Sequence, residues 1–186
     1  MQKACTARRM NKLLKYRNLT IRDAVVQDAE QLAKWWNDGR VMAHAGFPNG
    51  TGETAAEIAE TIKTCDTSHR LLMIEMDDIA IGEMSVRWKD DATAVIGIKL
   101  CEASRQNKGI GKILLSMLIS SLFHEEGCHR IILYVNLSNK RAQHVYEQLG
   151  FTSVRVNENS WTDQLGRLQS SVDYVLYQKD FIGYWD

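Results

Sequence analysis

Residues 93–123 read TAVIGIKLCEASRQNKGIGKILLSMLISSLF and contain the order of elements on which the predicted fold depends. Thr93 to Cys101 is aliphatic enough to predict a strand. A loop with two glycines follows, and Gly109 to about His124 is apolar on nearly all sides, which predicts a buried helix. The next apolar run, Arg130 to Asn136, predicts another strand. A strand, a helix and a second strand in this order predict a right-handed parallel crossover.

Further strands and helices are predicted on both sides of this crossover. Turn-forming aspartates at 77–78 and 90–91 join three strands into an antiparallel meander. The other expected strands cover residues 19–24, 71–76, 79–88, 151–157 and 170–179, and the expected helices cover residues 28–36, 54–64 and 139–149. We therefore expect an α/β fold whose mixed sheet changes from antiparallel to parallel pairing between residues 100 and 135.

Local capping signals mark several helix ends. Asp28-Ala29-Glu30-Gln31 and Thr54-Ala55-Ala56-Glu57 both have the pattern of a capping box. Gly39 and Gly150 follow predicted helices, where glycine readily adopts the left-handed conformation that ends a helix. Residues 40–52 are expected to form a loop, and residues 157–167 a polar turn around Trp161.

The composition is that of an ordinary globular chain. The 186 residues include 23 Lys and Arg and 23 Asp and Glu. This balance argues against a general polyanion binder, so no nucleic-acid partner is expected. No apolar run approaches the roughly 18 residues of a membrane helix, and the N-terminus lacks the apolar stretch of a secretory signal. We therefore expect no membrane partner and a cytoplasmic location.

The expected organisation is a single domain, residues 19–186, preceded by a flexible basic extension, residues 1–18. Because the extension is rich in Lys and Arg and has no acidic residue, an alternative reading is a nucleic-acid-binding arm. The four cysteines lie far apart, and none has the C-x-x-C spacing of a metal site: Cys5, Cys65, Cys101 and Cys128. Free thiols and no bound metal are expected.

The loop Gln106-Asn107-Lys108-Gly109-Ile110-Gly111 has the features of an anion site. Its glycines leave the backbone open to a ligand, and the first amides of the following helix have no internal acceptor. The helix dipole and the charges of Lys108 and Lys112 add to the attraction, so a pyrophosphate would be a suitable ligand. The pattern is neither a Walker nor a Rossmann motif. A tight turn between a strand and a helix would also use such glycines.

A second motif follows one helix and one strand later. Residues 139–151 read NKRAQHVYEQLGF. The two runs together resemble the GCN5-related N-acetyltransferase (GNAT) family, whose signatures are Q/R-x-x-G-x-G/A and N-x-x-A-x-x-x-Y-x-x-x-G-F. The resemblance is strongest from Ile96 to Phe151. Trp35-Trp36-Asn37-Asp38-Gly39 resembles the branch of ribosomal-protein N-terminal and aminoglycoside acetyltransferases.

The resemblance implies a GNAT fold, in which two neighbouring strands splay apart and hold the pantetheine arm of acetyl-CoA. Helices are expected on both faces of the mostly antiparallel sheet. Backbone groups around Ile98, Leu100 and Cys101 would hold the pantetheine. Amides from Gln106, Asn107, Lys108, Gly109, Ile110, Gly111 and Lys112 would hold the pyrophosphate, and Asn139 would contact the cofactor. The implied activity is direct transfer of an acetyl group to a primary amine.

Tyr146 occupies the position of the family's tyrosine, which implies that it protonates the thiolate leaving group. The alternative is a packing role, because Ala142, Val145 and Leu149 share its helix spacing. Glu83 is the first candidate for a general base, followed by Glu75 and His44. An alkyl amine with a pKa of about 10.4 is mostly protonated at neutral pH and needs such a base more than a peptide N-terminus does. Glu83 could instead face solvent, and the family often uses a bound water.

The acceptor is expected to be a small-molecule amine or a peptide N-terminus. Trp35, Trp36, His44 and Phe47 lie where the family builds part of its acceptor pocket, although aromatic residues on such a helix are more often core. Trp161 and Tyr174 lie in the other acceptor-side region. An exposed last strand could pair across a homodimer. The alternative functions are a non-enzymatic acyl-CoA-binding sensor with the same fold and a nucleotide-binding module.

Overall fold

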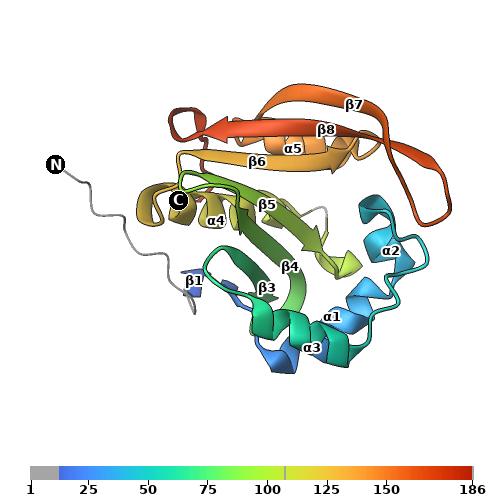
Figure 1. The fold of residues 1–186 in the computed structure, drawn as a ribbon. Coiled ribbons are helices and arrows are strands. Elements are labelled where there is room, and N and C mark those ends of the chain that lie inside the picture. The colour runs from blue at the N-terminus through green and yellow to red at the C-terminus, as the bar shows by residue number, and fades with distance from the viewer. Residues whose placement is uncertain (1–12, 107, 186) are drawn as a thin grey trace.

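The computed structural model describes residues 13–106 and 108–185, which form one eight-stranded sheet covered by helices (Figure 1). The strand order is β1-β2-β3-β4-β5-β6-β8-β7, and only the β5–β6 pair is parallel. The mixed, mostly antiparallel α/β sheet is therefore confirmed. The strands are β1 (Leu13–Tyr16), β2 (Leu19–Asp23), β3 (His69–Met76), β4 (Ile79–Trp88), β5 (Thr93–Leu100), β6 (Arg130–Asn136), β7 (Thr152–Thr162) and β8 (Leu168–Tyr177).

Helices cover both faces of the sheet because successive strand residues point to opposite sides. On β3, Leu72 and Ile74 join the core under α4 and α5, whereas Leu71 and Met73 join a second core under α1 and α3. The helices are α1 (Ala29–Trp36), α2 (Gly39–Met42), α3 (Ala55–Thr64), α4 (Ile110–Glu125) and α5 (Lys140–Gln148). Short 3₁₀ turns are η1 (Val26–Asp28), η2 (Ala43–Ala45), η3 (Ala103–Arg105) and η4 (Gln178–Asp180).

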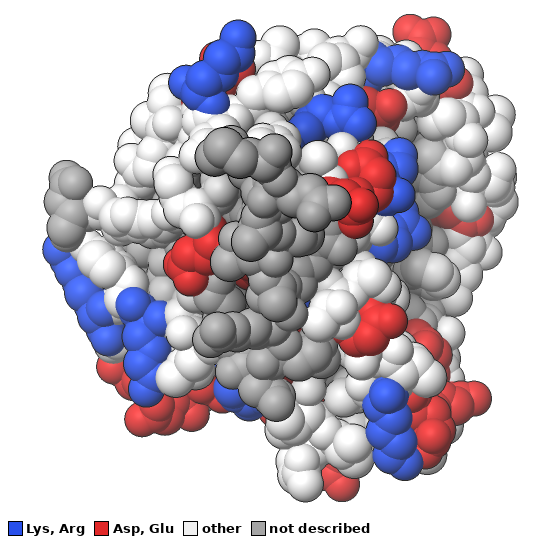
Figure 2. All heavy atoms as spheres, turned by 60° about the vertical axis from the view of Figure 1, so that its left-hand side comes forward, with Lys and Arg blue, Asp and Glu red and all other residues white. Residues whose placement is uncertain are grey.

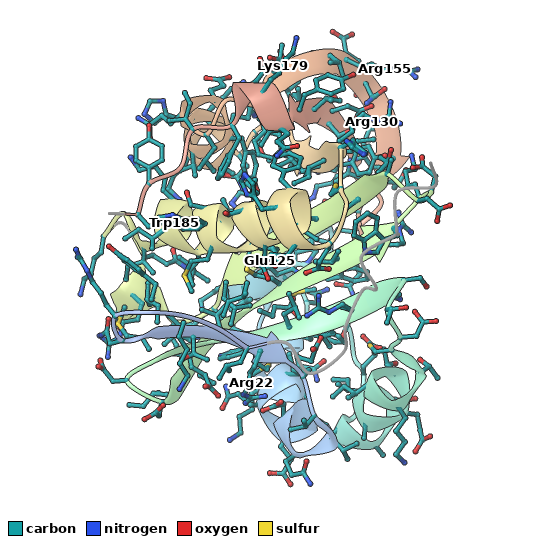
Figure 3. All side chains as sticks on the ribbon, turned by 90° about the vertical axis from the view of Figure 1, so that its left-hand side faces the viewer. Arg22, Glu125, Arg130, Arg155, Lys179 and Trp185 are labelled. Carbon is teal, nitrogen blue, oxygen red and sulfur yellow. The ribbon has the colours of Figure 1, made fainter. Side chains whose placement is uncertain are left out.

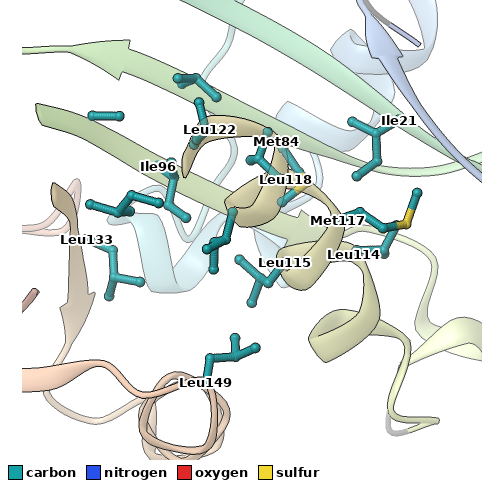
Figure 4. Packing of buried hydrophobic residues seen from close by; sticks show 14 of the residues in the cluster. Ile21, Met84, Ile96, Leu114, Leu115, Met117, Leu118, Leu122, Leu133 and Leu149 are labelled. Carbon is teal, nitrogen blue, oxygen red and sulfur yellow. The ribbon is translucent and has the colours of Figure 1, made fainter. Parts of the chain in front are cut away.

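Helix α4 is buried on most of its circumference, as its apolar sequence predicts. Leu114, Leu115, Leu118 and Leu122 are almost completely excluded from solvent and pack among side chains of the sheet (Figure 4). The C-terminal Trp185 is partly buried against the same core, beside α4 (Figure 3). The position of α4 is thus fixed by packing along its length, which also fixes the place of its N-terminus.

Strands β5 and β6 pair only at their beginnings. The parallel register joins residues 93–95 to residues 130–132 and then stops. Beyond this point β5 continues to pair with β4 as far as Leu100, and β6 continues to pair with β8 as far as Asn136. The two strands therefore diverge toward their C-terminal ends, which confirms the expected splayed pair (Figure 1).

The structure corrects several predicted boundaries. Residues 13–16 were assigned to the flexible extension, but they form β1, because Leu14 and Tyr16 pack against the core and pair with β2; residues 1–12 lie outside the described part. Strand β8 is not at an edge, since β6 and β7 flank it, so an exposed last strand does not support a homodimer. Strand β7 runs through the predicted turn to Thr162 with an irregular register, and the turn is held by Asp163, which accepts from the amides of Leu165 and Arg167.

Two predicted helix caps are also wrong. Gly39 does not terminate α1 but begins α2, where Asp38 caps the helix by accepting from the amide of Arg40. A side chain at Gly39 would collide with the Pro48 carbonyl, so close packing and not a left-handed conformation requires glycine there. Asp28 does not cap α1 through its side chain, because its carboxylate binds the guanidinium of Arg22 at 2.7 Å and the amide of Val25 (Figure 3 labels Arg22).

A buried ion network joins the sheet to α4. Arg70 is 3% exposed, and its guanidinium donates to Asp23 at 2.8 Å and to Glu126 at 3.4 Å. Ser121 of α4 donates to the same Glu126 carboxylate at 3.0 Å.

The Arg70→Met variant is expected to lower the free energy of unfolding by about 3–5 kcal/mol, because two buried carboxylates lose this guanidinium. Urea unfolding measures the change. Arg40→Met is the control, since Arg40 is exposed and its pair with Asp38 is screened by solvent. A loss for Arg70→Met no larger than for the control would contradict a stabilising role of the network.

Candidate active site

The loop after β5 folds back onto the end of that strand. The side-chain amide of Gln106 donates to the carbonyl of Leu100 at 2.8 Å. Arg141 of α5 donates to the side-chain oxygen of Gln106 at 3.2 Å and 3.3 Å. The structure therefore brings the two sequence motifs into direct contact. Asn107 lies outside the described residues.

Helix α4 begins with an open N-terminus at this loop. Gly109 is its N-cap, with a φ of +75° and no side-chain cap. A Cβ on Gly109 would meet nothing within 4 Å, so the left-handed backbone is what requires glycine. A Cβ on Gly111 would lie 3.8 Å from Leu100, an ordinary contact. Among the described residues the amides of Ile110 and Gly111 have no backbone acceptor, whereas the Lys112 amide donates to the Gly109 carbonyl at 3.2 Å. The first two amides of α4 are therefore open, which is a geometry that suits an anion.

The residues around the loop differ in how freely their side chains could approach an anion. Lys108 is exposed, and Lys112 places its ammonium 4.4 Å from the centroid of the Tyr184 ring. The side chain of Ile110 is buried, so only its backbone faces the loop. Lys108 is therefore the cation of this loop that is free to turn toward an anion, whereas Lys112 is held against an aromatic ring.

The unpaired end of β5 exposes backbone groups toward β6. The amide of Cys101 donates to Ile81 of β4 at 2.9 Å. Because the backbone groups of successive strand residues alternate in direction, those of Ile98 and Leu100 point toward the splay. The Cys101 amide is therefore turned away from the role expected for it. The backbone groups of Ile98 and the amide of Leu100 lie where a pantetheine arm could pair with them, whereas the Leu100 carbonyl already accepts from Gln106.

Tyr146 combines a buried ring with an accessible hydroxyl. The residue is 8% exposed, and its ring packs against Phe151 and Tyr174 at centroid distances of 5.8 Å and 6.1 Å. Burial raises the pKa of Tyr146 to about 12, so the phenol stays protonated at neutral pH. Its hydroxyl is not among the described buried polar atoms that lack a hydrogen-bond partner. The ring is therefore part of the core, and among the described residues the hydroxyl has no hydrogen-bond partner.

Asn139 is the N-cap of α5, and its side-chain oxygen accepts from the amide of Ala142 at 3.2 Å. It lies at the end of β6 where the two strands have diverged, on the same side as the start of α4. The capping bond occupies the oxygen and fixes the side chain at the mouth of the splay. Its backbone N–H donates to the Asn136 carbonyl at 2.9 Å, and its carbonyl accepts from the Gln143 amide at 3.2 Å. The side-chain nitrogen is thus the group left for the cofactor contact expected of Asn139.

The three candidate bases lie on different elements and have different surroundings. Glu83 is 3% exposed, and its Oε1 accepts from the Lys99 ammonium at 2.7 Å, directly across the β4–β5 pair. Its Oε2 is buried without a partner. Glu75 is bound by Arg22 at 2.7 Å, and His44 is exposed on η2. Glu83 does not face solvent, as one reading proposed, and the Lys99 ammonium occupies its Oε1, so only the buried Oε2 is left to accept a proton.

A cavity of about 430 Å³ lies between the N-terminal helices and β5. Trp36 and Phe47, two of the aromatic residues considered for the acceptor pocket, line it together with Lys99. Trp35 instead belongs to the second core and donates to Glu102 at 3.0 Å. The sequence did not indicate the remaining lining residues, because nothing local marks them as functional: Met42, Thr51 and Glu53.

The tip of the β7–β8 hairpin holds one wall of this cavity. Trp161 covers Gly46, where a Cβ would come within 2.5 Å of the indole. Gln164 makes three hydrogen bonds of 2.9–3.0 Å to the backbone of residues 46–50. The hairpin therefore fixes the loop that carries Phe47. Tyr174, the other residue expected on this side, is buried and donates to Glu147 at 2.9 Å.

The described residues give little sign of other kinds of site. They contain no group of three or more His, Cys, Asp or Glu placed to hold a metal ion. Across the same residues no helix has both the length and the apolarity to cross a membrane. Lys and Arg are interspersed with Asp and Glu on the face shown in Figure 2. Cys65, Cys101 and Cys128 are free thiols.

Comparisons with known proteins agree with this geometry. A sequence profile described as acetyltransferase (GNAT) domain matches residues 18–152. Comparison with curated proteins finds no match. The fold is similar to spermidine N-acetyltransferase from Vibrio cholerae in complex with CoA and spermine, with 21% identity, 88% of this chain and 97% of that chain covered, and a TM-score of 0.79.

Two further solved structures have the same fold. Ribosomal-protein-S5-alanine acetyltransferase from Vibrio fischeri is 15% identical, with 92% of this chain and 99% of that chain covered and a TM-score of 0.78. A protein from Salmonella typhimurium, solved with its cofactor acetyl-CoA, is 20% identical, with 87% and 94% covered and a TM-score of 0.71. At these identities the likeness concerns the fold alone.

Proposed function

Because this chain belongs to the GNAT acetyltransferase family, we propose that it transfers the acetyl group of acetyl-CoA directly to a primary amine. The observation that carries the proposal is the divergence of β5 and β6 beside the uncapped start of α4. A strand edge for an extended arm and a helix N-terminus for a pyrophosphate lie next to each other, as one molecule of coenzyme A requires.

The residues present fit this ligand. The backbone edges of Ile98 and Leu100 would pair with the amide groups of the pantetheine arm. The first amides of α4, from Gly109 onward, would bind the pyrophosphate, with Lys108 as the nearby cation. Arg141 would fix the loop through Gln106 and add positive charge at its rim. Asn139 would contact the arm from the start of α5.

When bound, acetyl-CoA supplies the thioester whose C–S bond breaks as the new C–N bond forms. Tyr146 would donate a hydrogen bond to the departing sulfur. A phenol with a pKa of about 12 is a weaker acid than a thiol of pKa about 8.5, so Tyr146 stabilises the thiolate and does not protonate it outright. The amine loses one proton on becoming an amide, and the thiolate gains one proton on becoming the thiol, so the reaction balances.

Glu83 acts through Lys99 in this proposal and is not the direct base. Its carboxylate holds the Lys99 ammonium at the cavity wall. The pair keeps this buried carboxylate neutralised beside the place proposed for the amine. The amine can then lose its proton to a bound water, which needs no further side chain.

The similar structures support an amine as the acceptor. One of them is a spermidine N-acetyltransferase and another acts on an alanine of ribosomal protein S5. The second also agrees with the branch that the Trp35–Gly39 stretch resembles. The cavity lined by Trp36, Phe47 and Lys99 is the proposed place of the acceptor.

Binding and turnover test the proposal separately. Acetyl-CoA at about 100 times its Kd is expected to raise the melting temperature by about 5–10 °C, and ATP by far less. A thiol-release assay with a panel of amines should then detect turnover. A melting temperature that acetyl-CoA leaves unchanged would contradict the cofactor assignment. Binding without turnover of any amine would contradict the transferase assignment.

A further inference from the structure

We infer that Glu53 selects acceptors that carry a second positive charge besides the amine that is acetylated. The inference rests on the proposed function and on the charges of the acceptor cavity. Among its lining residues only Glu53 and Lys99 are charged, and the others are mostly apolar. Whether the cavity prefers a cationic or an anionic acceptor therefore depends on which of these two charges is already neutralised.

The charge of Lys99 is matched within the protein. Its ammonium lies 2.7 Å from Oε1 of Glu83, and Glu83 is only 3% exposed. A carboxylate so far from solvent is strongly unfavourable without its cation, so the pair is held together. Lys99 is consequently a poor partner for an anionic group on an acceptor.

Within the described residues, no neighbouring cation neutralises the charge of the Glu53 carboxylate. In the part of the chain that the structure describes, no Lys, Arg or His forms an ion pair with it. Its backbone, in contrast, is fixed by Asn37, which donates to the Glu53 carbonyl at 2.8 Å and accepts from the neighbouring Gly52 amide at 2.7 Å. The amide of Glu53 also donates to Thr51. A carboxylate on a fixed backbone, half-buried and unpaired, is a preformed site for a cation.

The walls between the two charges suit a cationic aliphatic chain. Trp36 and Phe47 offer aromatic faces and Met42 a flexible apolar surface. Aromatic faces attract ammonium groups, and all three side chains can cover methylene groups. An anionic acceptor would meet the uncompensated charge of Glu53 instead.

The positions of the charges also give the orientation of the acceptor. Lys99 lies on β5, the strand that carries the proposed pantetheine site, whereas Glu53 lies on the loop before α3. The reacting amine therefore lies at the Lys99 end, next to the strand proposed to hold the thioester. The second cationic group lies at the Glu53 end. The expected class of acceptor is a linear molecule with at least two basic nitrogens.

The test compares linear diamines with monoamines and ω-amino acids of the same chain length. Thiol release gives kcat/KM for each acceptor. Diamines are expected to exceed monoamines by about tenfold or more, because a hydrogen bond to a charged partner contributes that much. The Glu53→Gln variant should lose this preference, because kcat/KM falls about tenfold more for diamines than for monoamines.

Glu60→Gln is the matched control, because Glu60 is an exposed carboxylate on α3 paired with Lys63. It should keep the full preference for diamines. Equal turnover of diamines and monoamines by the wild type, or a preference that survives in Glu53→Gln, would overturn the inference and leave the proposed function intact. A preference for ω-amino acids would show that Lys99 selects an anion instead. Failure of every amine to react would contradict the proposed function itself.

Discussion

Gly111→Glu is expected to lower the affinity for acetyl-CoA by about 100- to 1000-fold. The substitution places a carboxylate in the first turn of α4, beside the amides proposed to hold the pyrophosphate. Two like charges about 4 Å apart repel by about 4 kcal/mol at the effective dielectric of a protein surface, and each 1.4 kcal/mol is a factor of ten. Isothermal titration calorimetry measures the change in Kd.

Two variants at the same position separate charge from shape. Gly111→Gln has nearly the size of Gly111→Glu without its charge, so the difference between them reports repulsion. Gly111→Ala should fold normally, because the added Cβ meets only Leu100 at 3.8 Å and Gly111 has no positive φ. If the Glu and Gln variants bind acetyl-CoA equally well, the anion does not lie at this helix start.

The start of α4 could be predicted because its signals are local. Lys108, Gly109 and Gly111 stand directly at the start of the apolar helix, and the second motif follows one strand after that helix. The same holds for α3, where the Thr54 hydroxyl accepts from the Glu57 amide at 3.3 Å and the Glu57 carboxylate from the Thr54 amide at 2.8 Å. Both partners of this capping box lie within one turn.

Predictions of local contacts failed where a residue distant in the sequence bound the side chain instead. The sequence around Asp28 has the same form as a capping box, but Arg22 on β2 binds its carboxylate. The β4–β5 register also placed Lys99 opposite Glu83, a partner that the sequence did not indicate. No local pattern gives that register, and a shift of one residue would have put Glu83 on the other face of the sheet.

The acceptor cavity was the least predictable part of the site. Its loop, residues 46–53, is positioned by Gln164, which lies more than a hundred residues later and binds the carbonyl of Gly50. The bare backbone of Gly46 is needed for the Trp161 ring, yet in the sequence it is one more loop glycine. Because the site is assembled by contacts between such distant segments, the sequence of either segment alone gives little indication of it.

Tyr146→Phe is expected to lower kcat by about 100-fold or more, within the range that a positioned proton or hydrogen-bond donor contributes. The substitution keeps the ring that packs against Phe151 and Tyr174 and removes only the hydroxyl. Stability should therefore change by less than about 1 kcal/mol, and the affinity for acetyl-CoA by less than about threefold. Stopped-flow or steady-state thiol release, together with calorimetry, measures these quantities.

Tyr177→Phe is the control, since Tyr177 is exposed at the end of β8 and should leave kcat unchanged. The pH profile adds a second test. Because burial raises the pKa of Tyr146 to about 12, the donor form persists below that pH, so no loss of kcat from this group is expected near pH 10, where an unperturbed tyrosine ionises. An unaltered kcat in Tyr146→Phe would remove Tyr146 from catalysis. A fall in kcat without a change in acetyl-CoA affinity would place its action in the transition state, because an interaction made equally strongly before the reaction changes KM instead.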